Sequence, residues 1–243
     1  MSELPKIIIG VPGPWADSSE LVAAVVEKSG GYLFAGMVLM HTETQESFEL
    51  HFTDADPQFT EAFGVAGTLN VDEGDVRRVA DHAAVLYLLR DGGSLEAARS
   101  AMRAASALLD CGGIGVKVES TGVAFPPETW RQLTEDAGDE ATRFAFTTLV
   151  GGDGEFYSCG MHNIGERDAV IKADVPPDEA AAVLDAFNRY VVLERPTLLD
   201  GQTFSLDEDA PRYRFRRTDC DLYDDPEDSF HNPYGMWELT PTG

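Results

Sequence analysis

The chain has 243 residues, of which 43% are hydrophobic, so it is long enough and apolar enough to bury a core. It carries 18 Lys and Arg against 43 Asp and Glu, a formal charge of −25. A field of this sign repels phosphate backbones and anionic membrane surfaces, so we expect neither a nucleic-acid nor a membrane partner. The negative field favours encounter with a basic protein. The alternative is that the acidic surface only keeps the protein soluble.

No targeting segment is expected. The N-terminal sequence MSELPKIIIGVPGPW lacks a basic region, and its apolar run is too short for a signal peptide or a membrane span. The three cysteines, Cys111, Cys159 and Cys220, are an odd number without CxxC spacing, which indicates neither a disulfide framework nor a zinc knuckle. These features predict a cytoplasmic protein with reduced thiols and leave its oligomeric state open.

The first part of the chain alternates strands and helices. Residues 6–11 are a β-branched run typical of a buried strand, and a helix begins at Ser18 or Ser19. The expected buried face of that helix consists of Leu21, Val22, Val25 and Val26. The apolar run at 32–40 predicts one strand, paired in a hairpin with residues 47–52.

The middle of the chain contains the clearest helix. Residues 54–75 predict a partly ordered connection with a short helix after Asp56-Pro57. Residues 81–90 favour a central strand, and their periodicity also fits the continuation of a helix from Val76. Ser94 begins a helix with apolar residues at helical spacing, namely Leu95, Ala98, Met102, Ala105 and Leu109. Residues 114–119 alternate as a strand, and Pro126-Pro127 begins a helix that carries Trp130, Leu133 and Ala137 inward.

The second half predicts strands at 144–150, 155–160 and 169–173, followed by a helix after Pro176-Pro177. The buried stripe of that helix is Val183, Leu184, Phe187 and Val191. Residues 198–217 predict a hairpin. Residues 219–243 mix acids with aromatics and predict an irregular tail pinned to the body.

These elements predict an α+β fold with mixed, largely antiparallel sheets and covering helices. The order strand-helix-strand-strand near the start, with two strands and a helix near the end, also fits a pseudo-duplicated arrangement. No linker is long or polar enough to demand two domains, so we expect residues 1–243 to form one compact unit with a soft internal boundary near 64–75.

One stretch carries a family resemblance. Tyr157-Ser158-Cys159-Gly160-Met161 ends a strand, and Gly165-Glu166 precedes another strand and a covering helix. Over about residues 81–215 the chain resembles the bacterial domain-of-unknown-function family 4261 (DUF4261). The supporting matches are His82 before an apolar strand, Gly112-Gly113 before Val116, Trp130, and Asp200-Gly201-Gln202. The family favours a run of acids after the glycine that corresponds to Gly165, and in this chain Arg167 interrupts that run. The resemblance implies a fold and a bacterial origin, and it assigns no reaction and no catalytic residue.

The binding candidates cluster in the turn after Cys159. His162, Glu166, Arg167 and Asp168 lie together, and the turn predicts that the last three are presented outward as a charged contact surface or a solvated turn. Cys159 and His162 are three residues apart, but further metal ligands and a third catalytic group are missing. The sequence therefore predicts no metal, no cofactor and no catalytic residue here.

Other motifs point to no chemistry. His82 is expected to be a hydrogen-bonding residue at the entry of a strand. The tail acids Asp219, Asp221, Asp224, Asp225, Glu227 and Asp228 lack EF-hand spacing and are interrupted by a proline, so no calcium site is predicted. Neither GxGxxG nor GK[ST] is present, so no nucleotide site is predicted.

Three functional hypotheses follow. The first is a non-enzymatic interaction protein, such as an immunity-type protein that binds a basic toxin or effector. The second is a hydrolase or transferase whose site gathers His82, Cys159, His162 and Glu166 from separate parts of the chain. The third is a scaffold subunit. Convergent polar side chains in a deep pocket would favour the enzyme, and a flat acidic face would favour the binding protein.

Overall fold

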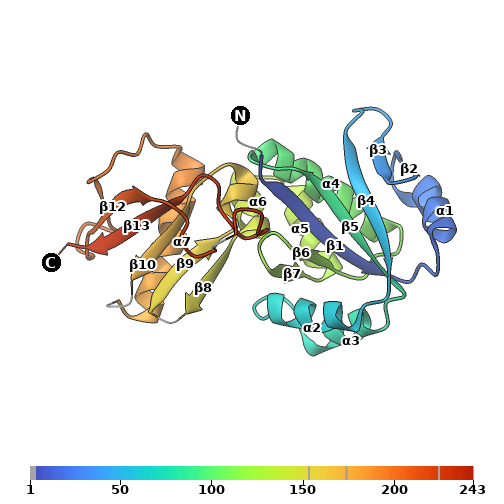
Figure 1. Ribbon diagram of the computed structural model, residues 1–243, viewed down its shortest axis with the longest axis horizontal. Helices are drawn as coiled ribbons and strands as arrows, with labels where there is room; N and C mark the ends of the chain where they lie inside the picture. The colour runs from blue at the N-terminus through green and yellow to red at the C-terminus, as the bar shows by residue number, and fades with distance from the viewer. Residues whose placement is uncertain (1–3, 153, 173–174, 224, 243) are drawn as a thin grey trace.

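The computed structural model describes residues 4–152, 154–172, 175–223 and 225–242. Within these ranges the protein is α+β, with seven α-helices and two β-sheets, which confirms the predicted class. Figure 1 shows the two sheets side by side, with helices behind both of them. The chain passes from one sheet to the other after residue 125, rather than at residues 64–75, which lie beside the first sheet. The single compact unit stays a prediction.

The first sheet is antiparallel throughout, with strand order β2-β3-β4-β5-β1-β6-β7. Its strands are β1 (Lys6–Gly13), β2 (Tyr32–Ala35), β3 (Val38–His41), β4 (Ser47–Asp54), β5 (Ala84–Asp91), β6 (Val116–Val118) and β7 (Val123–Phe125). β5 is central, as predicted, and is buried on both faces. Leu86 and Leu88 belong to the main core, whereas Val85 packs with Phe59 and Phe63 on the opposite face.

Four helices accompany this sheet, namely α1 (Ser18–Lys28), α2 (Pro57–Ala66), α3 (Glu73–Ala80) and α4 (Leu95–Asp110). α4 begins as predicted, because Ser94 is its N-cap and accepts a hydrogen bond from Ala97 N at 3.1 Å. α2 and α3 pack against the face opposite α4, and Figure 1 shows them below the strands.

Three expectations for this half are corrected. The run at 32–40 is broken into β2 and β3, because Gly36 has a φ of +63° and turns the chain. Val22 and Val26 are 38% and 67% exposed, so the buried face of α1 is narrower than the apolar pattern suggests. The short helix predicted after Asp56-Pro57 is α2, but the connection beyond it also leads into a helix, because Asp72 caps α3.

The second sheet is mixed, with strand order β11-β12-β13-β10-β9-β8. Its strands are β8 (Thr148–Gly152), β9 (Glu155–Cys159), β10 (Asp168–Lys172), β11 (Thr203–Phe204), β12 (Tyr213–Thr218) and β13 (Met236–Pro241). β10 and β13 are parallel, and the other neighbours are antiparallel. α7 (Pro177–Glu194) covers one face, where the Phe187 ring lies 5.3 Å from those of Phe204 and Phe215.

In the chain, α5 (Pro127–Asp136) and α6 (Asp139–Phe146) connect the last strand of the first sheet to the first strand of the second. Trp130 on α5 is fully buried, as predicted. Residues 144–146 end α6 and do not begin a strand, because Ala145 and Phe146 are buried on a helical face. Ala173, which the sequence places in a strand, lies outside the described residues. The tail is not wholly irregular, because residues 236–241 form β13 between β10 and β12.

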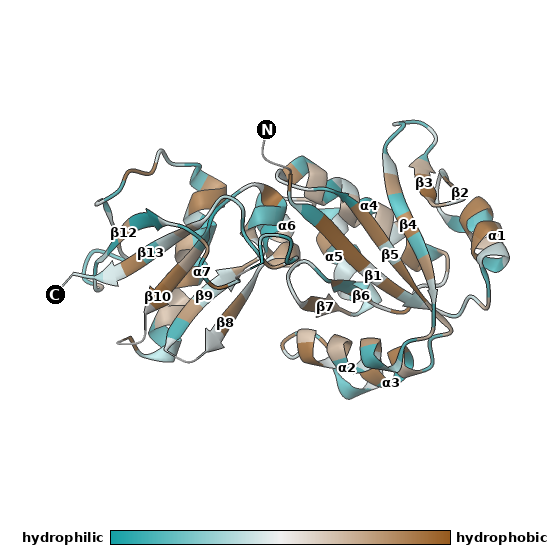
Figure 2. Ribbon diagram, in the orientation of Figure 1, coloured by the Kyte–Doolittle hydropathy of each residue, from teal (hydrophilic) through white to brown (hydrophobic). Residues whose placement is uncertain are grey.

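Between β12 and β13 lie residues 219–223 and 225–235, here named the acidic segment. Cys220 packs there with Val170 and Met236 in a small apolar cluster. In Figure 1 this red segment crosses in front, between the two sheets, and Figure 2 shows much of it as hydrophilic. No helix in the described ranges is both long and apolar enough to span a bilayer.

Candidate functional site

A buried polar cluster lies where the acidic segment meets the second sheet. Asp168, at the start of β10, is only 2% exposed. It accepts hydrogen bonds from Ser158 Oγ at 3.1 Å, Met161 N at 3.2 Å and Asn232 Nδ2 at 2.6 Å. One carboxylate therefore joins β9, the turn after it and the acidic segment.

The turn after β9 is the 3-10 helix η1 (Met161–Ile164), and glycines fix its two ends. Gly160 has a φ of +110° and Gly165 a φ of +91°. A Cβ atom added to Gly160 would lie 2.1 Å from Phe146 O, and one added to Gly165 would lie 2.4 Å from Gly93 O. Only glycine permits so close an approach, so η1 is held against α6 and the turn before α4.

Asn163 ties η1 to the first sheet. Its side chain is fully buried, accepts a hydrogen bond from Ser120 Oγ at 2.9 Å and donates one to Thr121 Oγ1 at 3.0 Å. Neither Asn163 nor Asn232 is predicted as a site residue from the sequence, because each bonds to residues distant in the chain. Buried hydrogen bonds of Asn163 therefore join η1 to the loop between β6 and β7 of the first sheet.

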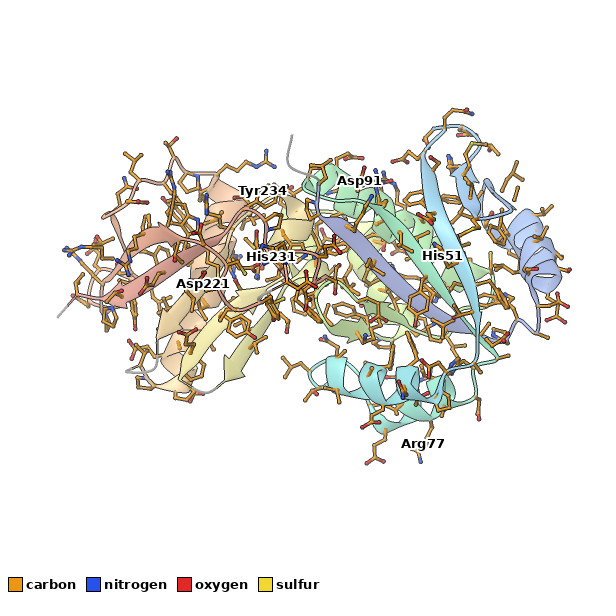
Figure 3. The ribbon with its side chains drawn as sticks, in the orientation of Figure 1. His51, Arg77, Asp91, Asp221, His231 and Tyr234 are labelled. Carbon is orange, nitrogen blue, oxygen red and sulfur yellow. The ribbon has the colours of Figure 1, made fainter. Side chains whose placement is uncertain are left out.

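His162 lies beside this cluster and is 1% exposed. Its Nδ1 is 4.0 Å from Asp168 Oδ2, and neither ring nitrogen has a hydrogen-bond partner among the described residues. The imidazole lines a cavity of about 310 Å³, bounded on one side by the start of β1 and on the other by residues 226–233. Figure 3 places His231, another lining residue, at the boundary between the two sheets.

The acidic segment brings negative charge to the mouth of this cavity. Its exposed carboxylates in the described ranges belong to Asp219, Asp221, Asp225, Glu227 and Asp228; Asp224 lies outside these ranges. None of the five forms an ion pair with a Lys or Arg in the described part of the chain. Asp225 accepts a hydrogen bond from Glu227 N at 2.9 Å, and Asp228 one from Phe230 N at 2.9 Å. These local turns fix the positions of the Asp225 and Asp228 carboxylates.

The outward-facing charged turn predicted at residues 166–168 is wrong. Asp168 is buried, and Glu166 and Arg167 are half-buried, because η1 and the acidic segment cover them. The Arg167 guanidinium lies 5.8 Å from the centre of the Trp237 ring, and burial lowers its pKa. The exposed charges therefore lie on the acidic segment, while the predicted binding residues hold that segment in place.

The structure places His82 apart from the groups around His162. His82 Nε2 accepts a hydrogen bond from Asp56 N at 3.0 Å, and Nδ1 donates to Val79 O at 2.7 Å, so its predicted hydrogen-bonding role is confirmed. Both nitrogens are thus engaged by the N-cap residue of α2 and the last turn of α3, the two helices that Figure 1 shows below the first sheet. His162 instead lies in η1, next to Asp168.

Cys159 should react slowly with alkylating reagents. The thiol is 2% exposed, and burial together with the charge of Asp168 raises its pKa well above the usual range. A catalytic thiolate needs the opposite environment. At pH 6 we expect iodoacetamide to label Cys159 in the folded protein more slowly than free glutathione, and to label it readily after unfolding in urea. Rapid labelling that depends on His162 would contradict this expectation.

Glu166→Gln should stabilise the protein at neutral pH. Burial raises the pKa of the Glu166 carboxyl, with the nearby Arg195 opposing the effect. Between its unfolded-state pKa and its raised folded-state pKa, such a carboxyl binds more protons in the folded than in the unfolded protein. The free energy of unfolding therefore falls as pH rises from the first pKa through the second. The glutamine variant should therefore unfold at higher urea concentration at pH 7, and the gain should vanish near pH 3, where both states are protonated. Glu135→Gln on the exposed surface is the control, and a gain that persists at pH 3 would contradict the titration.

A scan against models of protein families, and searches among curated proteins and solved structures, find no match to this chain. The resemblance to the domain-of-unknown-function family 4261 therefore stays a prediction.

Proposed function

We propose that the chain is a non-enzymatic binding protein of the bacterial cytoplasm, whose partner is a basic protein. Such a protein could act as an immunity-type protein that neutralises a basic toxin or effector. The supporting observation is the set of five exposed carboxylates on the acidic segment, none of which pairs with a Lys or Arg among the described residues. Two of them, Glu227 and Asp228, line the cavity beside His162, in a chain whose formal charge is −25.

The acidic segment suits this role because it is anchored. Cys220 is 9% exposed and Asn232 is 1% exposed, so both ends of the charged stretch are fixed to the body. A surface that is ordered before binding loses less conformational entropy on association. Carboxylates that are not neutralised internally also leave their field available to steer a cationic partner and to speed its association.

The non-enzymatic part of the proposal rests on the groups that an enzyme would need. The Cys159 thiol is buried with a raised pKa, which disfavours a thiolate nucleophile. Both nitrogens of His82 already form hydrogen bonds. The residues of the enzymatic hypothesis therefore lack an accessible nucleophile paired with a free base.

The test compares two triple variants with the same change in net charge. Asp221→Asn, Asp225→Asn and Glu227→Gln neutralise the acidic segment while keeping side chains that can still accept hydrogen bonds. Glu27→Gln, Glu61→Gln and Glu135→Gln neutralise exposed carboxylates on α1, α2 and α5. A partner captured from bacterial lysate would be identified, purified and titrated with the wild type and both variants.

We expect the acidic-segment variant to associate about tenfold more slowly at low salt, while the control variant stays close to the wild type. Raising the salt to about 1 M, where the Debye length is about 3 Å, should remove most of the difference. Equal effects of the two variants, or a captured partner as acidic as this chain, would rule the proposal out.

A further inference from the structure

We propose that the cavity beside His162 is a specific subsite that accepts one lysine or arginine side chain of the partner. This inference rests on the proposed function, and it adds the place and the chemistry of recognition. The cationic group would lie between His162 and the carboxylates of the acidic segment, and its alkyl stem would lie against the apolar wall. Four observations support this assignment.

The first observation is the state of His162. A neutral imidazole has one N–H donor and one bare nitrogen that accepts, and both are costly to leave unsatisfied in a buried site. The Asp168 carboxylate, 4.0 Å from Nδ1, favours the proton on that nitrogen. Nε2 is then a buried acceptor without a donor among the described residues. A ligand N–H would satisfy it.

The second observation is a further acceptor in the same cavity. His231 Nδ1 lies 3.3 Å from Tyr223 O, and because a carbonyl oxygen only accepts, Nδ1 carries the proton. Its Nε2 is therefore an acceptor as well. Two imidazole acceptors in one cavity suit a group with several N–H donors, as an ammonium or a guanidinium has.

The third observation is the charge around the opening. Glu227 and Asp228 contribute carboxylates to the lining, and both are exposed. Lys6 also lines the cavity, but its Nζ forms an ion pair with Asp91 Oδ1 at 2.5 Å, which offsets its charge. An anionic ligand would have to enter past the two carboxylates, whereas a cation would be attracted by them.

The fourth observation is the size and apolar wall of the cavity. Leu4, Ile8, Pro226 and Pro233 line it together with the polar groups. Its volume of about 310 Å³ lies at the lower end of the range of small-molecule sites, about 300–1,000 Å³. Lysine and arginine combine an alkyl stem, which packs on apolar surface, with a charged end that needs acceptors. Such a side chain matches both parts of the lining.

The test uses small probes on the full chain, so it needs no partner. n-Butylammonium and n-butylguanidinium would be titrated while the histidine ring signals are followed by NMR. The signals of His162 and His231 should shift saturably at millimolar probe concentration. His51, which pairs with Glu49 at 2.7 Å on β4 and is labelled away from the cavity in Figure 3, is the internal control and should not shift.

Two matched probes separate hydrogen bonding from charge alone. n-Butyltrimethylammonium has the same charge but no N–H group. Its affinity should be lower than that of n-butylammonium by a factor of about ten or more, as expected for the loss of a hydrogen bond with a charged donor. n-Butanoate should leave the His162 signal unchanged. If butanoate shifts the signal and butylammonium does not, or if the trimethylated probe binds as well as butylammonium, the assignment is overturned.

Variants of the chain give an independent readout. His162→Phe keeps a planar ring and removes both nitrogens, so probe binding should weaken about tenfold while the protein stays folded. Asp228→Asn removes one charge at the opening and keeps a side chain that accepts a hydrogen bond, so it should weaken binding even if the phenylalanine variant fails to fold. Unchanged probe affinity in a folded variant of either kind contradicts the subsite.

The proposed function and the subsite can fail separately. If the probes bind but neutralising the acidic segment leaves partner association unchanged, the subsite stands and the proposed function fails. If neutralisation slows association but the probes do not bind, the partner uses the acidic segment without this subsite.

Discussion

Met102→Asp should lower the free energy of unfolding by about 4 kcal/mol or more, because it places an unpaired charge in the core. Met102 is 1% exposed and lies midway along α4. Its carbonyl oxygen also accepts the hydrogen bond from Trp130 Nε1 at 3.2 Å, so α5 docks at this turn. Urea unfolding followed by circular dichroism would measure the loss.

Ala23→Asp is the matched control, because it adds the same charge to an exposed position of α1. It should cost about 1 kcal/mol or less, close to the difference in helix propensity. An unfolding midpoint for Met102→Asp equal to that of the wild type would mean that α4 is not packed as the structure indicates.

α4 was predictable from the sequence because its information is local. A serine N-cap and an apolar repeat over four turns specify both where the helix begins and which face is buried. The start of α2 after Asp56-Pro57 was predictable in the same way, and the capping box of Asp72 and Asp75 is the local signal that indicates α3. Sequence analysis thus succeeds where the determinants lie within a few residues of one another.

The tail was harder to predict because its partners are distant in the sequence. β13 pairs with β10, whose residues lie almost 70 positions earlier, for example Asp168 opposite Met236. Trp237 and Leu239 do alternate toward the α7 face, and this was the available signal for a strand. The run of acids and turn residues before it is typical of an irregular segment, and this pattern makes the short strand signal difficult to recognise.

The candidate site was predictable only in its location. The sequence pointed to residues 162–168, but the exposure of a charged turn depends on what later covers it. Here the covering group comes from the acidic segment, where Asn232 bonds both Glu166 O and Asp168. Local residue types do not reveal this contact, and on their own they predict a surface charge where the structure has a buried carboxylate.

Asp168→Ala should lower the free energy of unfolding by about 3–5 kcal/mol, because it leaves three buried donors without their acceptor. These are Ser158 Oγ–H, the Met161 N–H and the Asn232 side-chain amide. Asp168→Asn should cost less, because an asparagine oxygen can still accept from some of them, although its amide would face that of Asn232. Urea unfolding would measure the loss, and limited proteolysis would report whether residues 219–235 have come loose.

Asp54→Ala, which removes an exposed carboxylate at the end of β4, is the control and should change stability by about 0.5 kcal/mol or less. Cleavage within the acidic segment should rise in Asp168→Ala alone, since Asn232 then loses its shortest hydrogen bond to the body. If the segment instead stays resistant and stability is unchanged, Asp168 does not hold it. The carboxylates would then lack the fixed arrangement on which both the binding surface and the cationic subsite depend.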